Sequence, residues 1–273
     1  MDTWTKKIYR GGNMIDGIKA HIQAIKAALA IRMAYRVDFL LSLLIMLLVE
    51  FSAPFITLLV YDNGASFPGW SLYEALLIQA VFMLSRGIAF PLFFGMVWNT
   101  LGRVREGTLD VLLLKPRSLL HMLIMTSFDS EDLGKLVGGL LLFTLSLSHL
   151  PFPGPLQWVE FFLVFMFSMI MLFAFALFMS GSAVIWVGNG RVFEIFSAIT
   201  SFGQYPVSIF SKPVQTFATI VVPVSLLGSF PAAVLIGKPT PGIIAAIGSS
   251  ILFLIISYLF WKRMMYRYSS AGG

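Results

Sequence analysis

Apolar residues dominate this chain in long runs that are separated by short polar stretches. Six runs are long enough to be interpreted as membrane spans, because crossing a hydrocarbon core takes roughly 20 residues of helix. The runs cover Phe39 to Val60, Leu72 to Val97, Leu133 to Leu150, Val159 to Val187, Val192 to Phe210 and Ile243 to Trp261. The pattern therefore predicts an all-α integral membrane protein with six transmembrane helices.

The region before the last span allows two counts. Val192 to Phe210 contains the charged Glu194, whereas the apolar stretch within residues 212–238 is interrupted by Pro223 and Pro231. Proline breaks a straight helix, so we interpret residues 212–238 as a re-entrant helical hairpin, whose free backbone groups must be covered by protein. In the alternative count this stretch is the fifth span, and the preceding run is an amphipathic helix on the cytoplasmic face. Both counts give six crossings.

The N-terminal region is amphipathic rather than apolar. From Met14 to Met33 apolar residues recur at helical spacing, while Lys19, Lys26 and Arg32 lie on other faces. We expect residues 1–38 to contain an amphipathic interfacial helix on the inner membrane surface. A solvated helix packed on another subunit fits the same pattern.

Composition and charge agree with one membrane domain over residues 1–273. Hydrophobic residues make up 58% and charged residues 12% of the chain, whereas soluble domains carry about 25% charged residues. Sixteen of the 19 Lys and Arg fall on the side of the predicted spans that holds both termini. By the positive-inside rule this side is cytoplasmic. The net charge of +6 therefore indicates topology, and we expect no nucleic-acid partner.

Signatures of catalysis are missing from the sequence. The chain contains no cysteine, and its three histidines have no companion at metal-ligand spacing. The nearest match to a phosphate-binding loop, Gly237 to Thr240, lacks the leading glycine and has Pro239 where Ser or Thr would bind magnesium. We expect no catalytic residue, no bound cofactor and no metal in this chain, and we expect that it is not an enzyme.

Two charged residues lie inside predicted spans. Glu50 follows the start of the first span by eleven residues, and Arg86 precedes the end of the second span by eleven. At about 1.5 Å per residue both lie roughly 16 Å from the inner boundary. Because charges in hydrocarbon are costly and usually paired, we predict an intramembrane ion pair. It either fixes the packing of two helices, or lines or gates a substrate path.

The longest predicted cytoplasmic connection, residues 98–130, contains a short amphipathic helix. Thr108 can cap a helix through Leu114, with Asp110 favoured in the first turn and Lys115 followed by proline at the end. The apolar side, which could enter a groove of a partner, consists of Leu109, Leu112 and Leu113. A loop helix lying on the membrane fits the same pattern.

A family resemblance rests on this segment. Glu106-Gly107-Thr108-Leu109-Asp110, with Leu112-Leu113 and Lys115-Pro116, resembles the E-G-T-L-(D/E)-x-L-L-x-x-P signature of ABC type-2 exporter permeases. Tyr205 to Ile209 and the paired Pro223 and Pro231 are similar to elements of the bacterial branch of viologen-exporter-like and uncharacterised ABC permeases. Lys115 departs from the Arg or Thr of many relatives.

The resemblance implies the permease subunit of an ATP-driven exporter that moves a hydrophobic or amphipathic substrate outward across the bacterial inner membrane. Two permease chains, identical or homologous, would form the pathway among membrane lipids. Two copies of a separate ABC ATPase subunit, which hold ATP and Mg, would dock on the cytoplasmic face. The helix from Thr108 to Leu114 would be the coupling helix. Its charged contacts would be Arg105, Glu106 and Asp110, with Gly188 to Arg191 as a smaller second contact.

Two other functional classes remain open on the residues alone. An ion-coupled secondary transporter places acidic groups or broken helices near the membrane midplane, and Glu50 is one such group. A membrane-embedded enzyme or scaffold is the other alternative. The substrate and the identity of the second permease chain are not encoded in any motif that we recognise.

Overall fold

The computed structural model describes most of the chain as helix. The described residues are 22–23, 25–27, 30, 33–115, 117–129, 132–186 and 190–268, and they contain no strand. The predicted interfacial helix near the N-terminus lies mostly outside these residues. The all-α class is therefore confirmed for the described part of the chain.

Four helices in the described ranges are long and apolar enough to cross a membrane. They are α3 (Arg36–Glu50) continued by α4 (Ser52–Asp62), α5 (Leu72–Ala89) continued through η1 (Phe90–Phe94) by α6 (Met96–Glu106), α10 (Pro155–Ser182), and α14 (Ile243–Arg267). A fifth apolar helix, α9 (Leu133–Ser148), has 16 residues and is shorter. The count of six spans stays a prediction.

The remaining helices are short. Two follow α6, namely α7 (Leu109–Leu113) and α8 (Leu119–Met125). Between α10 and α14 the chain forms α11 (Gly190–Ser201), the 3-10 turns η2 (Phe202–Gln204) and η3 (Val207–Ile209), α12 (Lys212–Thr216), the π-helix η4 (Phe217–Val221), the 3-10 turn η5 (Val224–Leu227) and α13 (Ser229–Leu235). The run from Val192 to Phe210 is thus helical only in its first part.

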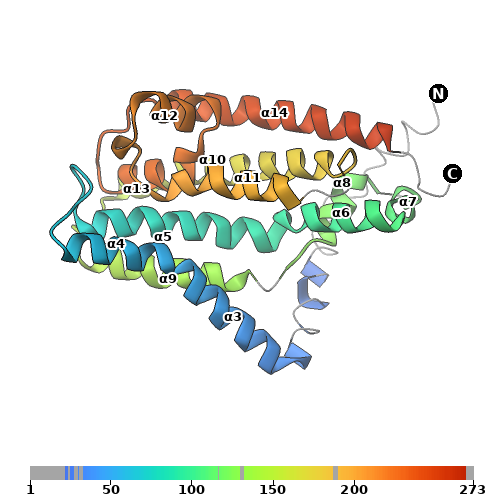
Figure 1. Ribbon diagram of the computed structural model, residues 1–273, viewed down its shortest axis with the longest axis horizontal. Coiled ribbons are helices and arrows are strands. Elements are labelled where there is room, and N and C mark those ends of the chain that lie inside the picture. The colour runs from blue at the N-terminus through green and yellow to red at the C-terminus, as the bar shows by residue number, and fades with distance from the viewer. Residues whose placement is uncertain are drawn as a thin grey trace.

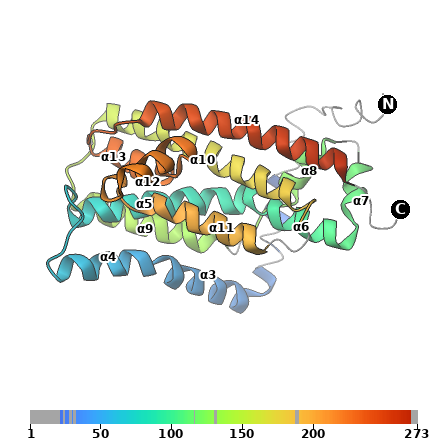
Figure 2. The same ribbon diagram turned by 45° about the horizontal axis from the view of Figure 1, so that its top comes forward.

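The helix α5 lies at the centre of the bundle. Figures 1 and 2 show it between α9 and the α10–α14 pair, with α3 and α4 at the periphery. In the most apolar 18-residue stretch of the long α5–α6 helix 78% of the residues are buried, compared with 11% in the corresponding stretch of the first span. Close approach to α9 requires glycine, because a Cβ on Gly139 would lie 2.8 Å from the amide nitrogen of Leu84, and one on Gly87 would meet the backbone of Leu136. These two glycines leave the room that α5 and α9 need to pack so closely.

The first span bends at Phe51, between α3 and α4. Pro54 has no amide hydrogen and therefore cannot bond the carbonyl of Glu50, four residues earlier. A second proline, Pro91, lies in η1, where the wider π-helical turn accommodates it without ending the helix. The carbonyl of Pro91 accepts a hydrogen bond of 3.2 Å from the amide of Asp129, so the segment before α9 is tied to η1.

The broken segment between α11 and α14 is buried in protein. Residues Val224 to Leu227 are 1% exposed or less. Ser85 of α5 donates a 2.9 Å hydrogen bond to the carbonyl of Leu227, and Ser168 of α10 donates to the carbonyl of Leu226. Side chains of α5 and α10 thus donate to backbone carbonyls that have no partner within a helix. Irregular backbone inside a bilayer is tolerated only where such groups are paired.

The two prolines of this segment differ in effect. Pro223 lies at the start of η5, where the helical pattern is interrupted. Pro231 is the third residue of α13, where a missing amide hydrogen removes no helical bond. The break predicted at Pro223 is found, whereas the break predicted at Pro231 is wrong. Whether the segment is a re-entrant hairpin stays a prediction.

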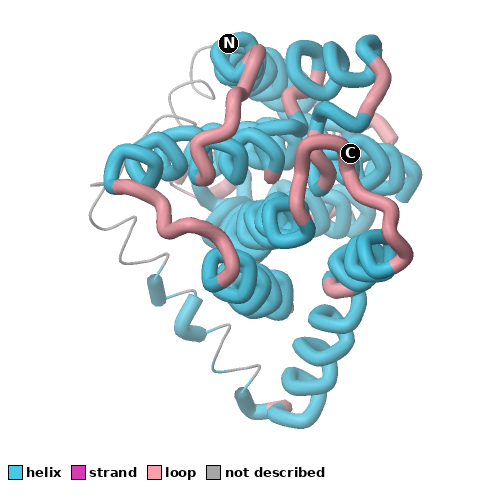
Figure 3. Tube along the Cα trace, turned by 90° about the vertical axis from the view of Figure 1, so that its left-hand side faces the viewer, coloured by secondary structure: helices cyan, strands magenta, loops and turns pink. Residues whose placement is uncertain are grey.

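Several loops meet at one end of the bundle, the end that faces the viewer in Figure 3. Here Lys238 Nζ donates hydrogen bonds of 2.6 Å both to the carbonyl of Gly69 and to Glu74 Oε2, and it lies 4.3 Å from the centre of the Trp70 ring. The indole of Trp70 in turn donates to Ser208 Oγ at 3.1 Å. One lysine therefore connects the α4–α5 loop to the loop before α14.

Candidate functional site

Within the predicted cytoplasmic connection, residues 98–130, the helix α6 ends at Gly107. This residue has a φ of +67°, a left-handed conformation that favours glycine. The amide of Thr108 donates to the carbonyl of Arg103 at 2.9 Å, and the amide of Gly107 donates to Val104 at 3.4 Å. This pair of bonds is a Schellman motif, which ends a helix and turns the chain sharply. Gly107 thereby determines the direction in which α7 leaves α6.

The short helix α7 runs from Leu109 to Leu113, close to the predicted range. Thr108 occupies the N-cap position, but its side chain makes no capping hydrogen bond. The capping role predicted for Thr108 is therefore wrong. Its backbone is not extended as capping requires, because the preceding turn at Gly107 already sets its conformation.

The apolar side of α7 faces the chain itself. Leu109 is 0% and Leu112 is 1% exposed, and Leu113 packs against the same core cluster, which also holds Val104 of α6 and Leu123 of α8. We expected these three leucines to be presented to a partner, and for Leu109 and Leu112 this expectation is wrong. Helical periodicity showed that they share a side but could not show that α6 and α8 cover it.

The opposite side of α7 is open. Val111 is 55% and Leu114 is 71% exposed, and exposed charged residues surround them. We call this set the exposed α7 surface; it consists of Arg105, Glu106, Val111, Leu114 and Lys115. Asp110 lies at its edge and is half-buried. Two exposed apolar side chains three residues apart on one short helix, with charges around them, form the kind of anchor that protein interfaces use.

Hydrogen bonds fix this region to the end of the long helix. Arg103 Nε donates to Asn99 Oδ1 at 2.6 Å, and Asn99 Nδ2 donates to Thr126 Oγ1 at 2.7 Å, just beyond α8. The buried hydroxyls of Thr100 and Ser180 lie 2.8 Å apart and connect α6 to α10. These polar residues were not identified from the sequence, although Asn99 and Arg103 stand at i, i+4 spacing.

The α5–α6 helix is longer than one crossing of a bilayer requires, and α7 follows its end. Its 35 residues at about 1.5 Å per residue give roughly 52 Å, whereas a hydrocarbon core is roughly 30 Å thick. Figure 1 shows α7 at the far end of this helix, beyond most of α10 and α11. A surface at this position is accessible to a soluble partner.

The structure brings Glu50 and Arg86 together. Arg86 Nη1 lies 3.6 Å from Glu50 Oε1, and the two side chains are 20% and 9% exposed. The guanidinium carbon also lies 5.3 Å from the centre of the Phe82 ring and 5.1 Å from that of Phe90. The ammonium of buried Lys135 lies 4.4 Å from the centre of the same Phe90 ring. Lys135 also forms an ion pair with Asp132.

This charged cluster therefore joins α3, α5 and α9 around one phenylalanine. Sequence reasoning assigned Lys135 to topology and missed its packing role. Its position at the start of an apolar run, next to Asp132 at i−3, was the available signal. The part of the chain that the structure describes contains no group of three or more His, Asp or Glu that could hold a metal.

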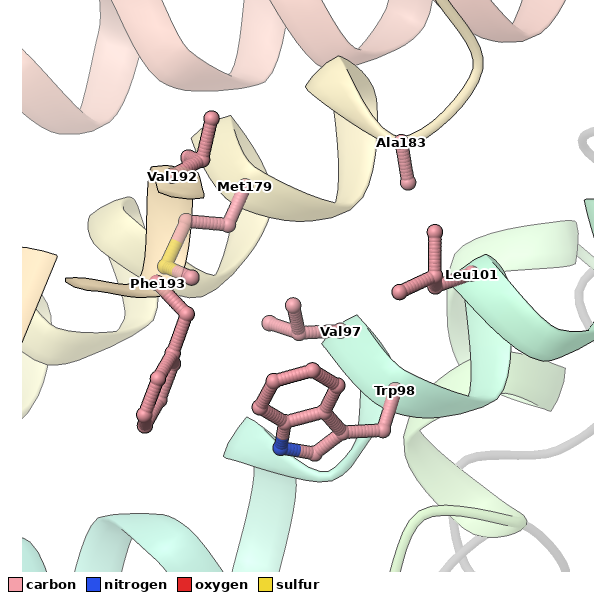
Figure 4. A pocket seen from close by; sticks show the side chains of 7 residues that line it. All are labelled: Val97, Trp98, Leu101, Met179, Ala183, Val192 and Phe193. Carbon is pink, nitrogen blue, oxygen red and sulfur yellow. The ribbon is translucent and has the colours of Figure 1, made fainter. Parts of the chain in front are cut away.

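A small apolar pocket lies between the long helix and α11. Figure 4 shows Trp98 and Phe193 side by side at one edge, with Met179 and Ala183, from the end of α10, above them in this view. The two ring centres are 4.9 Å apart. Of the predicted second contact, Gly188 and Asn189 lie outside the described residues, and Arg191 is the second residue of α11, immediately before the pocket residue Val192.

Comparison with known protein families gives one match. Residues 44–272 match the family model described as "ABC-2 family transporter protein". The match covers more than four fifths of the chain and includes the charged cluster, α7 and the broken segment. No curated protein and no solved structure matched the chain.

Proposed function

Because the chain belongs to the ABC-2 transporter family and is a multi-pass membrane permease subunit, we propose that it exports a hydrophobic or amphipathic substrate using a separate ABC ATPase. The ATPase subunit holds ATP and Mg, and this chain contributes the membrane path. Two copies of the ATPase serve two permease chains, identical or homologous. The assembly resides in a bacterial plasma membrane.

The observation that carries the proposal is the exposed α7 surface at the end of a helix too long for the bilayer. A coupling element must be reachable from the cytoplasm, must offer anchors to the ATPase and must be rigidly joined to the spans. Val111 and Leu114 supply exposed apolar anchors. Leu109 and Leu112, buried beneath them, supply the rigid connection. The resemblance of the Glu106–Asp110 segment to exporter permeases points the same way.

The mechanism we propose starts with closure of the ATPase dimer against α7. Because Leu109 and Leu112 are fully packed, α7 cannot yield independently, and its displacement passes to α6 and α8. The bonds through Asn99 and Thr100 then carry the movement toward the segment before α9 and to α10. Close packing transmits such displacements because cores are dense and poorly compressible.

We propose six crossings with both termini in the cytoplasm. The charge distribution of the sequence supports this orientation. In this proposal α9 is a fifth crossing that is shorter than the other four, and the run from Val192 to Phe210 or, in the alternative count, the broken segment is the sixth. The broken segment, with its backbone covered by Ser85 and Ser168, reaches into the membrane before α14. The Glu50–Arg86 pair fixes the first span against α5 near the membrane midplane.

The docking role of α7 is tested by co-purifying the permease with a candidate ABC ATPase subunit. We expect Val111→Asp and Leu114→Asp to abolish retention of the ATPase, because each places a charge at an apolar anchor. Phe152→Asp is the matched control, since Phe152 is 84% exposed in the loop after α9, at the other end of the bundle. Full retention of the ATPase by both α7 variants would contradict the docking role.

The transport class is tested in inside-out vesicles that contain the complex. The probe is tetraphenylphosphonium, a hydrophobic cation of the proposed substrate class. We expect its uptake to require ATP and to survive an ionophore that dissipates ion gradients. Uptake that the ionophore abolishes, or that proceeds without ATP, would favour the ion-coupled secondary transporter instead.

A further inference from the structure

The C-terminal end of α14 lies beside α7. Figures 1 and 2 both show the last turns of α14 next to α7 and α8. Tyr268, the first residue after α14, packs against the core cluster that contains Leu109 and Leu112 of α7, as does Met265. Trp261, one of the buried members of this cluster, also belongs to α14. The last helix therefore ends in the packing that supports α7.

The hydroxyl of Tyr268 is a buried hydrogen-bond donor without a partner among the described residues. The pKa of Tyr268 is raised, first by burial and second by the nearby carboxylate of Asp110 on α7. The hydroxyl therefore stays protonated at any physiological pH. A buried phenol whose proton has no acceptor, close to a carboxylate, is poised to donate to that carboxylate, since leaving a buried donor unpaired is costly.

Two other unpaired polar atoms occupy α14. Ser257 Oγ and Trp261 Nε1 are buried and have no hydrogen-bond partner in the described ranges, and their residues lie one turn apart on the same side of the helix. On this side Trp261 packs closely on α10, because a Cβ on Gly181 would lie 3.0 Å from the Trp261 Cα. Buried polar groups are normally paired. Two groups on α14 and a third on the residue that follows it therefore have no partner in the described position of the helix.

We propose that Tyr268 is a positioning residue that connects α14 to the coupling helix, and that its hydroxyl bonds the Asp110 carboxylate when the ATPase presses α7 inward. This inference rests on the proposed function. The bond makes α14 move with α7, so that the last span slides along α10, a shear of two packed helices. Transport force then reaches the membrane by two routes, one through α6 and one through α14.

The first test compares Tyr268→Phe with wild type in the complete complex with its ATPase, reconstituted in lipid nanodiscs. The substitution keeps the ring in the core and removes only the hydroxyl, so we expect the ATPase to remain bound and the melting temperature to be preserved. Permease-dependent stimulation of ATP hydrolysis should fall about fivefold. Asp110→Asn should act similarly, and the double variant should be no worse than either single variant.

Tyr266→Phe is the matched control, because Tyr266 is 52% exposed two residues earlier, and we expect it to behave as wild type. Unchanged stimulation in Tyr268→Phe, or strictly additive losses in the double variant, would overturn the proposal. Loss of ATPase binding in Tyr268→Phe would also overturn it, because that result assigns the hydroxyl to docking. Failure of the proposed function is distinguishable, because wild type would then show no stimulation at all.

A second measurement follows the movement directly. The chain has no cysteine, so single cysteines for spin labels can be introduced without background at Gly102, which faces open space near the end of α6, and at the exposed Tyr266. Because α6 moves with α7 in the proposed mechanism, we expect the distance between these labels to stay constant on adding ATP and vanadate, while the distance from Gly102 to a label at Phe152 changes. In the Tyr268→Ala background the first distance should change as well. If the first distance changes in the wild-type background when ATP and vanadate are added, α14 does not follow α7 and the proposal is wrong.

Discussion

Replacing Arg86 with Gln removes the only charge that the structure places within ion-pair distance of Glu50, among the residues it describes. We expect this substitution to lower the free energy of unfolding by about 3 kcal/mol, because it leaves a carboxylate without a partner in a nearly dry site. Glu50→Gln should cost a similar amount, since it leaves the guanidinium of Arg86 facing only the rings of Phe82 and Phe90.

The magnitude follows from the separation and the burial. At 3.6 Å and an effective dielectric constant of about 20, the Coulomb attraction between two unit charges is about 4 to 5 kcal/mol. The desolvation penalty of two ions offsets most of this attraction. The double variant Glu50→Gln with Arg86→Gln, which removes both charges, should therefore differ from wild type by only about 1 kcal/mol. The coupling free energy between the two sites should be several kcal/mol.

The assay is equilibrium unfolding in mixed micelles of mild detergent and SDS, applied to wild type, both single variants and the double variant. Asp62→Asn is the control, because Asp62 is an exposed charge at the other end of the same span. The exchange of Glu50→Arg with Arg86→Glu should recover part of the stability. The reasoning is refuted if each single change is harmless, or if the single effects simply add and the exchange fails.

Three further outcomes follow from the geometry. Gly107→Ala should lower thermal stability by about 1 to 2 kcal/mol because of its left-handed φ, whereas Gly102→Ala, in open space within α6, should be neutral or stabilising in the same melting experiment. Ser85→Ala should cost about 1 to 3 kcal/mol in SDS unfolding, because a buried carbonyl in η5 loses its donor. Lys238→Gln should release the α4–α5 loop, detected as faster amide exchange of that loop, and should lower stability by about 1 kcal/mol.

Hydropathy predicted the long helices, whose formation follows from the need to pair backbone groups inside a bilayer. The runs from Leu72, Val159 and Ile243 each correspond to a long helix, because an apolar segment of this length can bury its backbone only by forming one. The same argument cannot locate breaks inside an apolar run. The π-helical turn at Pro91 lies inside such a run. What marks it is a contact with a distant segment, the hydrogen bond from the amide of Asp129 to the carbonyl of Pro91.

Periodicity predicted which residues of α7 share a side but not what covers that side. Leu109 and Leu112 could equally have met a partner or their own chain, and the outcome depends on α8, which returns beneath α7 after a loop of a few residues. Likewise Lys135 has the sequence context of a topology signal, yet it packs over Phe90 in the interior. Contacts between segments distant in sequence decide both cases.

The π-helical turn between α5 and α6 also sets the rotational phase of the cytoplasmic end. One residue added to an α-helix rotates everything after it by about 100° and advances it by about 1.5 Å. The side of α6 that presents Asn99 to Thr126 and Thr100 to Ser180 is therefore chosen some two turns earlier, at Phe90 to Phe94. A deletion within that turn would leave both ends of the helix intact but would rotate Asn99 and Thr100 away from Thr126 and Ser180.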